Sequence, residues 1–312
     1  MNTVQTPDGS AVAADTDRLI AYASAALGVP LRPETAVPDE SGWDFFVLHV
    51  TDAHGRQWIL RRPRRPSSVA QLATEAAVLD LVRDRVGVRT PHWHVNTTDL
   101  VAYSRLPGAP AGAEDQRDLV YKWAIDPLAA TGQYLEPLAR ALVAVHTTPP
   151  ELLHRLPSAT PDGLRAEVAA RLARAERELP LSAAGARRWH AWLDDDALWP
   201  DHLVLIHGDI HPGHTLVEDS PATGPRLTGL LDWANATVGD PAADFMDMYY
   251  AGGTPVLDRL LAAYRSSGGH VWPGMAAHIR ARASFLWVHV ALRGLDTDRP
   301  HLVETALARL QG

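Results

Sequence analysis

The chain contains no cysteine and a single lysine, Lys122, although it has many arginines. Without cysteine there can be no disulfides, thiolate zinc sites or cysteine nucleophiles, and this composition fits a reducing compartment. Any chemistry that needs a lysine must therefore use Lys122 or be performed by an arginine.

Basic charge and long apolar runs are also scarce. The 312 residues include 29 Lys and Arg against 37 Asp and Glu, a formal net charge of −8. Phosphate backbones select basic surfaces, so this balance argues against a nucleic-acid partner. No apolar run reaches the roughly 18 residues of a membrane span, and the N-terminus lacks the pattern of a secretory signal. We therefore expect a cytoplasmic monomer that interacts with neither nucleic acids nor membranes.

The spacing of apolar residues predicts an α+β fold. A hydrophobic content of 46% is enough for the core of one large domain or two lobes. In the first part of the chain, helical spacing alternates with β-branched and aromatic runs. These patterns predict, in order, a helix at 15–28, a β-hairpin of 43–50 and 56–62, a helix at 67–86, and strands at 92–96 and 99–103.

The rest of the chain is expected to be mainly helical. Pro107 and Gly108 interrupt the pattern, and we place there the boundary between an N-terminal lobe (1–107) and a C-terminal lobe (108–312). One strand-like island, 204–231, lies within the second lobe. Helices are predicted at 115–124, 132–147, 161–178 and 183–196, and several more follow residue 240.

The island contains the main chemical motif, IHGDIHPGHTLVE at 206–218. Asp209 follows an apolar run, His214 lies five positions further on, and a second apolar run leads to Asp232. Phosphoryl transfer requires a carboxylate near the acceptor hydroxyl, and a second carboxylate with one more ligand to hold Mg²⁺ against the nucleotide phosphates. Protein kinases present these groups in the same order and spacing.

The strand-rich first part supplies the remaining features of that pattern. Kinases place a basic residue on the second strand of a hairpin and a glutamate on the next helix. Here these positions are Arg61 and Glu75, so an arginine would replace the usual lysine and contact phosphate through its guanidinium group. Arg62, Arg64 and Arg65 remain alternatives for this contact.

The histidines of the motif also suggest a zinc site, but the sequence argues against it. Their spacing is H-x₃-H-x₂-H from His207 to His214, no cysteine can complete the ligand set, and the HExxH pattern is absent. We interpret His207 and His211 as residues that orient the loop by hydrogen bonding. Mg²⁺ prefers oxygen ligands. Either the ion accepts one nitrogen ligand from His214, or His214 binds phosphate or water instead.

Three linked motifs, HGDIHPGHTLV, LTGLLDW and VGDPAADF, resemble the aminoglycoside phosphotransferase and choline kinase group. The HPGH form, WILRRPRRP and ALWPDHLVLIHGD resemble the macrolide 2′-phosphotransferases within it. This resemblance covers most of the chain. It implies a two-lobed protein-kinase-like fold, with an N-terminal antiparallel sheet and helices and a larger, mainly helical C-terminal lobe. It also implies transfer of a phosphoryl group, usually from GTP, to the 2′-hydroxyl of the desosamine sugar of macrolides.

The resemblance assigns roles to individual residues. Asp209 would be the catalytic base or hydroxyl-orienting carboxylate, and His214 and Asp232 would be Mg²⁺ ligands. The N-terminal lobe would bind the nucleotide, and the hinge near Tyr103 would receive the purine. The expected nucleotide-binding residues are Gly42, Ile59, Arg61, Glu75, Tyr103, Ser104, Leu106 and Leu231.

Other candidate residues have simpler structural interpretations. Asp240 and Asp244 in GDPAADF could be catalytic, but Asp240 stands before Pro241 at a helix start, where a carboxylate caps free backbone amides and can also steady the loop. An aromatic set in the second lobe is more often core than pocket, yet a wide apolar ligand such as a macrolide would need some of it. The set consists of Tyr249, Tyr250, Phe285 and Trp287, and we take Tyr249, Phe285 and Trp287, with Asp209, as candidate substrate contacts.

The function predicted from the sequence is therefore a Mg²⁺-dependent macrolide 2′-phosphotransferase that uses GTP or ATP. One alternative is an aminoglycoside kinase, or another small-molecule kinase, of the same fold. Aminoglycosides are polycations that call for an acidic groove, whereas the segment after residue 240 is rich in Leu, Val, Trp and Tyr, which favours an apolar ligand. A second alternative is a non-catalytic nucleotide-binding protein, which the absent lysine would suit.

Overall fold

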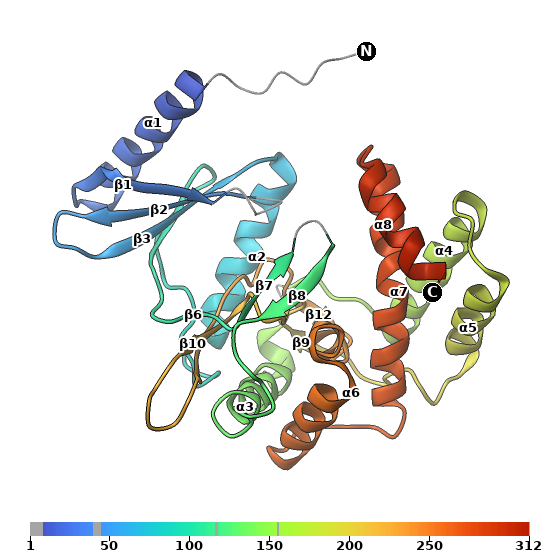
Figure 1. Ribbon diagram of the computed structural model, residues 1–312. Helices are drawn as coiled ribbons and strands as arrows, with labels where there is room; N and C mark the ends of the chain where they lie inside the picture. The colour runs from blue at the N-terminus through green and yellow to red at the C-terminus, as the bar shows by residue number, and fades with distance from the viewer. Residues whose placement is uncertain (1–8, 40–44, 116–117, 155, 312) are drawn as a thin grey trace. The chain divides into compact units, whose positions relative to one another are not determined.

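The computed structural model describes residues 9–39, 45–115, 118–154 and 156–311 (Figure 1). The chain forms two compact units. Unit 1 contains the described residues up to Leu79 together with Pro91–Leu106, and unit 2 contains Asp80–Thr90 and the residues from Pro107 onward.

Unit 1 is built on a five-stranded antiparallel sheet in the order β1-β2-β3-β5-β4. The predicted hairpin is confirmed as β2 and β3, and the later strands as β4 and β5. The elements of this unit are α1 (Gly9–Leu27), β1 (Leu31–Asp39), β2 (Phe45–Asp52), β3 (Gln57–Pro63), α2 (Pro66–Val82), β4 (Trp93–Asn96) and β5 (Val101–Ser104).

The two faces of this sheet pack against different helices because strand side chains alternate in direction. Leu48 and Leu60 belong to one buried cluster with Leu19 of α1. Ile59, the neighbour of Leu60, belongs to a second cluster with Leu72 of α2. The helix predicted at 15–28 is confirmed up to Leu27, although α1 begins earlier, at Gly9. Gly28 adopts a left-handed φ of 68° directly after α1.

The strand β1 was not predicted. Its sequence, LRPETAVPD, contains Pro33 and Pro38 and few apolar residues. As the first strand in the sheet order it needs hydrogen bonds along one side only, which makes proline tolerable there.

Unit 2 is mainly helical and encloses three small sheets. A large core cluster in this unit contains Trp189, Trp192 and Phe285. Its helices are α3 (Leu135–His146), a 3-10 helix (Pro150–Leu152), α4 (Pro161–Glu178), α5 (Ala183–Asp194), α6 (Ala243–Ser266), α7 (Met275–Asp296) and α8 (Pro300–Gln311). The helix α6 bends at Gly253, where φ is 67°, two residues before Pro255.

The helix predicted at 115–124 is wrong. Its described residues instead include the end of β7 (Gly112–Asp115) and all of β8 (Val120–Trp123), two strands that pair in an antiparallel hairpin. The hairpin is fixed to α6 by two hydrogen bonds, from Trp123 Nε1 to the carbonyl of Ala251 (2.9 Å) and from the Tyr250 hydroxyl to the carbonyl of Leu119 (3.0 Å). Packing against α6 therefore decides the conformation of a segment whose polar residues left its periodicity ambiguous.

The strand-like island at 204–231 is confirmed, and it divides between two of the small sheets. One contains β9 (Val204–Ile206) and β12 (Thr237–Gly239). The other contains β10 (Thr215–Glu218), β11 (Arg226–Leu230) and β6 (Ala109–Pro110). The segment from His207 to His214 connects the two sheets, and we name it the catalytic loop because it contains Asp209, the residue predicted to be catalytic.

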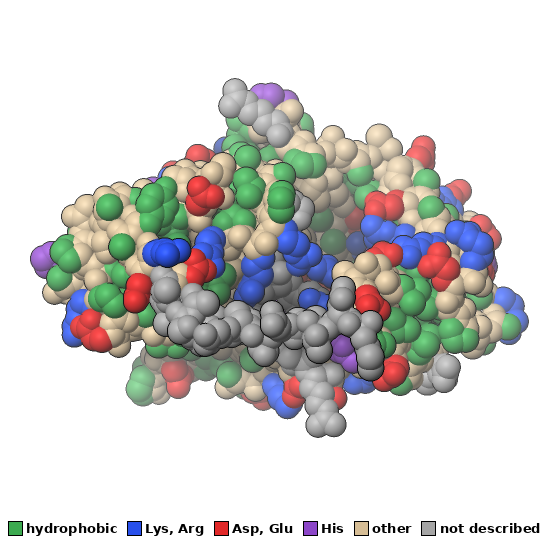
Figure 2. Space-filling model, turned by 90° about the horizontal axis from the view of Figure 1, so that it is seen from above, with side chains coloured by type: hydrophobic (Ala, Val, Ile, Leu, Met, Phe, Trp, Pro, Cys, Tyr) green, Lys and Arg blue, Asp and Glu red, His purple; other side chains and the backbone are tan. Residues whose placement is uncertain are grey.

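Acidic and basic side chains are interspersed with apolar ones on the face shown in Figure 2. This mixture agrees with the nearly balanced composition of the chain. Within the described residues, the helices are too short or too polar to cross a membrane.

Candidate active site

The second residue of the catalytic loop is a glycine that no other residue could replace without strain. Gly208 has a φ of 82°, which L side chains rarely adopt. A Cβ atom at this position would also lie 2.5 Å from the carbonyl oxygen of Asn235. The backbone here can therefore pass close to the segment that follows β11.

A buried carboxylate on α6 holds this start of the loop. Asp244 accepts hydrogen bonds from the backbone N–H of His207 (2.9 Å) and of Gly208 (2.6 Å). His146 Nε2 donates to the same carboxylate at 3.0 Å, and the hydroxyl of Tyr264 lies 2.8 Å from His146 Nδ1. Burial alone would raise the pKa of Asp244, but the hydrogen bond and charge of His146 and the loop amides lower it overall. Asp244 is therefore an ionised anchor for the loop.

His207 joins the loop to the end of β11. Its Nδ1 accepts the backbone N–H of Asp209 at 3.3 Å, so Nε2 carries the proton and donates to the carbonyl of Leu231 at 2.9 Å. Burial lowers the pKa of His207, which keeps the ring neutral. The prediction that His207 orients the loop is confirmed.

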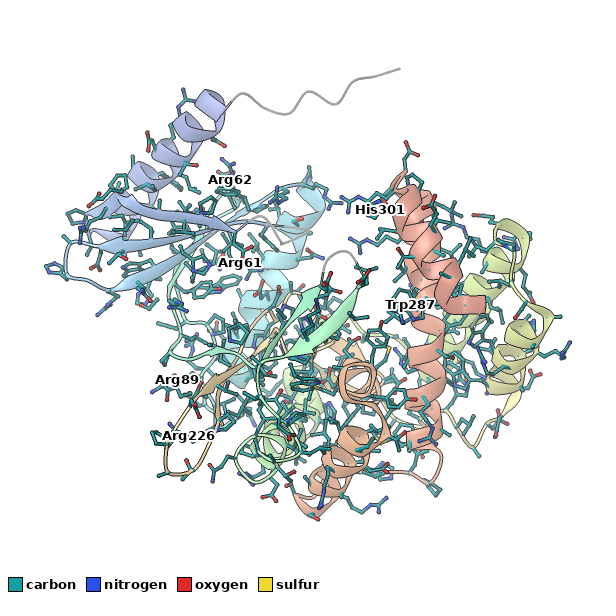
Figure 3. All side chains as sticks on the ribbon, viewed as in Figure 1. Arg61, Arg62, Arg89, Arg226, Trp287 and His301 are labelled. Atoms are coloured by element: carbon teal, nitrogen blue, oxygen red, sulfur yellow. The ribbon has the colours of Figure 1, made fainter. Side chains whose placement is uncertain are left out.

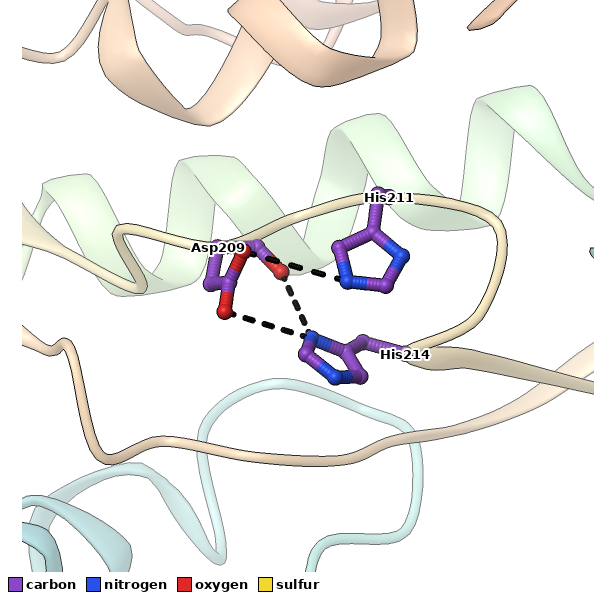
Figure 4. A group of neighbouring side chains, drawn as sticks. All are labelled: Asp209, His211 and His214. Carbon is purple, nitrogen blue, oxygen red and sulfur yellow. Dashed lines mark hydrogen bonds and ion pairs between the residues drawn. The ribbon is translucent and has the colours of Figure 1, made fainter. Parts of the chain in front are cut away.

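The side chain of Asp209, unlike that of Asp244, is partly exposed, at 28%. Asn235 Nδ2 donates to one carboxylate oxygen at 3.0 Å. His211 Nε2 and His214 Nδ1 lie 3.8 Å and 3.7 Å from the carboxylate (Figure 4). Desolvation raises the pKa of Asp209, His214 and His207 oppose the rise, and the charge of Asp232 adds to it. One oxygen is therefore tied to Asn235, and the other is available to a hydroxyl.

His214 and Asp232 approach each other beside Asp209. His214 Nδ1 donates to the backbone carbonyl of Asp209 at 3.0 Å, so Nε2 bears the lone pair and lies 3.8 Å from Asp232 Oδ2. Asp232 adopts a left-handed φ of 55°, a conformation unusual outside glycine. One carboxylate oxygen and one imidazole nitrogen thus converge, and this donor pair fits a divalent cation that takes its other ligands from phosphate oxygens and water.

His211 completes a group of three possible metal ligands. Asp209, His211 and His214 each offer an atom within 4.8 Å of the others. His211 Nδ1 accepts the N–H of Gly213 at 3.0 Å, so its Nε2 carries the proton that faces Asp209. Burial lowers the pKa of His211 to about 2, and the ring stacks on Tyr121 with centroids 4.8 Å apart. To bind metal at Nε2, His211 would have to change tautomer and lose the loop hydrogen bond, which argues against zinc here.

Unit 1 holds the predicted Arg61–Glu75 pair. Arg61 Nη1 lies 2.7 Å from Glu75 Oε1, and the two side chains are 6% and 0% exposed. The guanidinium also lies over the ring of Phe45, 4.2 Å from its centroid (Figure 3). Of the alternative arginines, Arg62 pairs with Asp15 and Arg64 donates to a backbone carbonyl. The predicted contact of Arg61 with Glu75 is confirmed, and the choice of arginine for the phosphate stays a prediction.

The other predicted nucleotide contacts lie in both units. Ile59 and Tyr103 are cross-strand partners, Ser104 pairs with Trp58, and Leu106 is the last residue of unit 1. In unit 2, the backbone N–H of Leu231 donates to the carbonyl of His214 at 2.8 Å. Gly42 lies outside the described residues. The nucleotide-binding roles of all these residues stay predictions.

The predicted substrate contacts lie on α6 and α7. Phe285 is 1% exposed and contacts the rings of Trp189 and Trp192, as a core residue does. Trp287 is 6% exposed, with the ring of Tyr250 at 5.8 Å (Figure 3). Tyr249 on α6 is half-buried. Their contact with a substrate stays a prediction.

The sequence did not reveal the support of the loop. Asp240 was interpreted as a helix cap that also steadies the loop, whereas the carboxylate on the loop amides is that of Asp244. Asp240 is the residue that accepts from a nearby helix-start amide, that of Ala242, at 2.9 Å. His146 and Tyr264 come from distant helices, and only the motif GDPAADF could have pointed to their partner.

The chain is similar to known proteins in both sequence and structure. A model of the phosphotransferase enzyme family (APH) matches residues 35–278. A solved macrolide 2′-phosphotransferase type I is 34% identical, covers 99% of both chains and has a TM-score of 0.82. Macrolide 2′-phosphotransferase MphH from Brachybacterium faecium is 34% identical over 95% of this chain and 98% of its own, with a TM-score of 0.81. The uncharacterized protein YcbJ of Bacillus subtilis is 33% identical over 91% of this chain and 92% of its own.

More distant structures share the fold alone. The GDP complex of an aminoglycoside 2′-phosphotransferase is 18% identical, covers 96% of this chain and 97% of its own, and has a TM-score of 0.78. The predicted kinase-like α+β fold is therefore confirmed. The chain belongs to the phosphotransferase enzyme family.

Proposed function

We propose that the protein transfers the γ-phosphoryl group of GTP or ATP to the 2′-hydroxyl of the desosamine sugar of macrolide antibiotics. The observation that carries this proposal is the convergence of Asp209, His214 and Asp232 on the exposed side of a loop that Asp244 anchors. The 34% identity to two macrolide 2′-phosphotransferases over nearly the whole chain supports the choice of acceptor.

In this mechanism Asp209 receives the substrate hydroxyl. Its oxygen that Asn235 does not bind accepts the hydroxyl hydrogen and directs the hydroxyl oxygen toward the phosphoryl group. His214 and Asp232 would hold Mg²⁺, which when bound neutralises phosphate charge. The fixed backbone of the loop keeps these side chains in place, so catalysis depends mainly on positioning and on neutralisation of charge.

The nucleotide contact in unit 1 would come from Arg61. Glu75 fixes the guanidinium through a buried ion pair at 2.7 Å, and a rigid guanidinium can bind phosphate oxygens. The GDP complexes of the aminoglycoside phosphotransferases support a nucleotide donor for this fold. Because the reaction needs a nucleoside triphosphate, we place it in the cytoplasm.

An aminoglycoside kinase is the second candidate. Its support is the shared fold, since solved aminoglycoside phosphotransferases resemble the chain at 18% identity or less. The higher identity to macrolide enzymes favours the macrolide. A non-catalytic protein is disfavoured because carboxylate and imidazole groups occupy the positions that phosphoryl transfer needs.

Nucleoside diphosphate release in a matrix of donors and acceptors tests the proposal. GTP and ATP are each combined with erythromycin, a larger-ring macrolide and kanamycin, and the site of phosphorylation is located by NMR. We expect turnover with macrolides and the phosphate on the 2′-oxygen. Activity on kanamycin alone would overturn the macrolide acceptor and leave the kinase reaction, while no transfer to any acceptor would argue against a small-molecule kinase of either kind.

A further inference from the structure

A second buried carboxylate, Asp247, lies on α6 one turn after Asp244. It is 9% exposed, so it is about nine-tenths buried. Unlike Asp244, it makes no hydrogen bond or ion pair with any residue of the described part of the chain. A buried carboxylate without a partner costs free energy, so its presence needs an explanation.

The charges around Asp247 do not compensate it. Burial raises its pKa well above the ordinary value, and the negative charges of Asp209 and Glu114 raise it further. Arg282 opposes this rise, but its guanidinium is bonded to Asp240 at 2.9 Å. Asp247, Asp209 and Glu114 therefore make an excess of negative charge that a cation would relieve.

Two tyrosine rings, those of Tyr121 and Tyr250, lie close to these carboxylates. Tyr121 of β8 feels the charges of Asp247, Glu114 and Asp209, which together with burial raise its pKa. The ring of Tyr121 stacks on His211 and meets the edge of Tyr250 with centroids 6.1 Å apart. The Tyr250 hydroxyl is bonded to the carbonyl of Leu119, which fixes this ring between the hairpin and α6.

We propose that Asp247, with the rings of Tyr121 and Tyr250, forms a subsite for an alkylated ammonium group that the substrate carries beside its reacting hydroxyl. The carboxylate pairs with the positive charge, and the aromatic faces bind its methyl groups through cation–π attraction. The inference rests on the proposed function for the position of the hydroxyl at Asp209. It adds that the enzyme selects amino alcohols over plain alcohols.

The proposed acceptor has this chemistry. Desosamine carries a dimethylamino group on the carbon next to its 2′-hydroxyl, and the amine is protonated at neutral pH. With the hydroxyl at Asp209, the adjacent ammonium group would be received by Asp247 and Tyr121. A primary ammonium group would instead need several hydrogen-bond acceptors, and it would gain less from the aromatic faces.

Two small probes test the subsite without any phosphoryl transfer. One is trans-2-(dimethylamino)cyclohexanol, and the other is trans-2-isopropylcyclohexanol, which has nearly the same shape and no charge. Dissociation constants are measured by NMR titration of the full-length protein. We expect the wild type to bind the amine at least about tenfold more tightly, because only the amine carries a charge that can pair with the buried carboxylate.

Asp247→Asn keeps the shape of the side chain and removes its charge. We expect this variant to bind the two probes within about twofold of each other, and to fold at least as stably as the wild type because an uncompensated charge is removed. Asp258→Asn, an exposed change on the same helix, should retain the wild-type preference. Tyr121→Leu should narrow the preference by several-fold, because the carboxylate remains and the aromatic face is lost.

Equal binding of the two probes to the wild type, or an undiminished amine preference in Asp247→Asn, would overturn the subsite. The wild-type comparison decides the question even if Asp247→Asn does not fold. Macrolide turnover is measured separately. An amine preference without macrolide turnover contradicts the proposed function alone, and macrolide turnover without an amine preference contradicts the subsite alone.

Discussion

Asp244 and Asp247 lie one helical turn apart on α6 and differ in their chemistry. We call Asp244 and its contacts the supporting side of the catalytic loop, and the carboxylates Asp209 and Asp247 its open side. On the supporting side, Asp244 binds two loop amides and His146, and these partners lower its pKa. On the open side, burial raises the pKa values of both Asp247 and Asp209. The charge of Asp209 adds to the rise at Asp247, and the charge of Asp232 adds to the rise at Asp209.

The difference separates stability from function in one small region. Paired carboxylates with lowered pKa values stabilise the folded state, because unfolding would release the favourable contacts. Carboxylates crowded together with raised pKa values destabilise it, and folded proteins retain such groups mainly where a ligand or a reaction uses them. The supporting side therefore fixes the backbone of the loop, and we call it the frame. The open side is a site whose negative charge bound cations would neutralise.

The largest expected effect comes from Asp209→Asn on the open side. We expect turnover to fall by about 10² to 10⁴-fold, the range typical of a lost general base or orienting group. The thermal midpoint should not decrease, because the change removes a partly desolvated charge. Steady-state kinetics and thermal unfolding measure the two quantities on the same sample.

Asp219→Asn is the matched control for this prediction. Asp219 is an exposed carboxylate just after β10, so its substitution should change neither turnover nor stability. If Asp209→Asn retained near-normal turnover, the assignment of the hydroxyl-accepting carboxylate would be wrong. If it lost stability instead, Asp209 would belong to the frame.

The mirror-image change on the supporting side is Asp244→Asn. An amide cannot accept from His207, Gly208 and His146 at once, so a buried donor is left without an acceptor. Breaking a buried charged network typically lowers the free energy of unfolding by about 3–5 kcal/mol. We expect a loss of this size in urea unfolding, with Asp258→Asn unchanged. A stable variant that had lost only activity would contradict the role of Asp244 as an anchor.

Local patterns predicted the parts of the fold that local interactions determine. The helix predicted at 161–178 matches α4 because Thr160 caps it and Pro161 fits its first turn. The hairpin β7–β8 was predicted as a helix because its conformation depends on hydrogen bonds to α6 across more than a hundred residues. The edge strand β1 was missed because two prolines removed the usual signal.

The candidate site shows the same division. Asp209, His214 and Asp232 could be identified because one short motif and the next strand contain them. The structure brings His214 within 3.7 Å of Asp209 and within 3.8 Å of Asp232. Asp247 and the contacts of His146 and Tyr264 could not be identified, because helices α3 and α6 create these contacts only when they pack. Distance in sequence, rather than chemical type, separates the two sets.

The pH dependence of stability gives the smallest of these effects and tests the frame at a third carboxylate, Asp240. Burial alone would raise its pKa, but Arg282 and His278, at 2.9 Å and 2.7 Å, lower it to about 2. The stabilisation is thus complete above the unfolded value near 4 and is lost as the pH falls through 2. This shift corresponds to about 2 kcal/mol.

The measurement for Asp240 is the difference in unfolding free energy between the wild type and Asp240→Asn. We expect this difference to shrink by about 2 kcal/mol between pH 4 and pH 2, because the wild-type carboxyl becomes protonated and resembles the amide. The open side should respond with the opposite sign. The raised pKa of Asp209 destabilises the folded state as the pH rises above 4, so the gain from Asp209→Asn should grow in that direction. Equal pH slopes for the two variants would remove the distinction between a stabilising frame and a site that awaits cations.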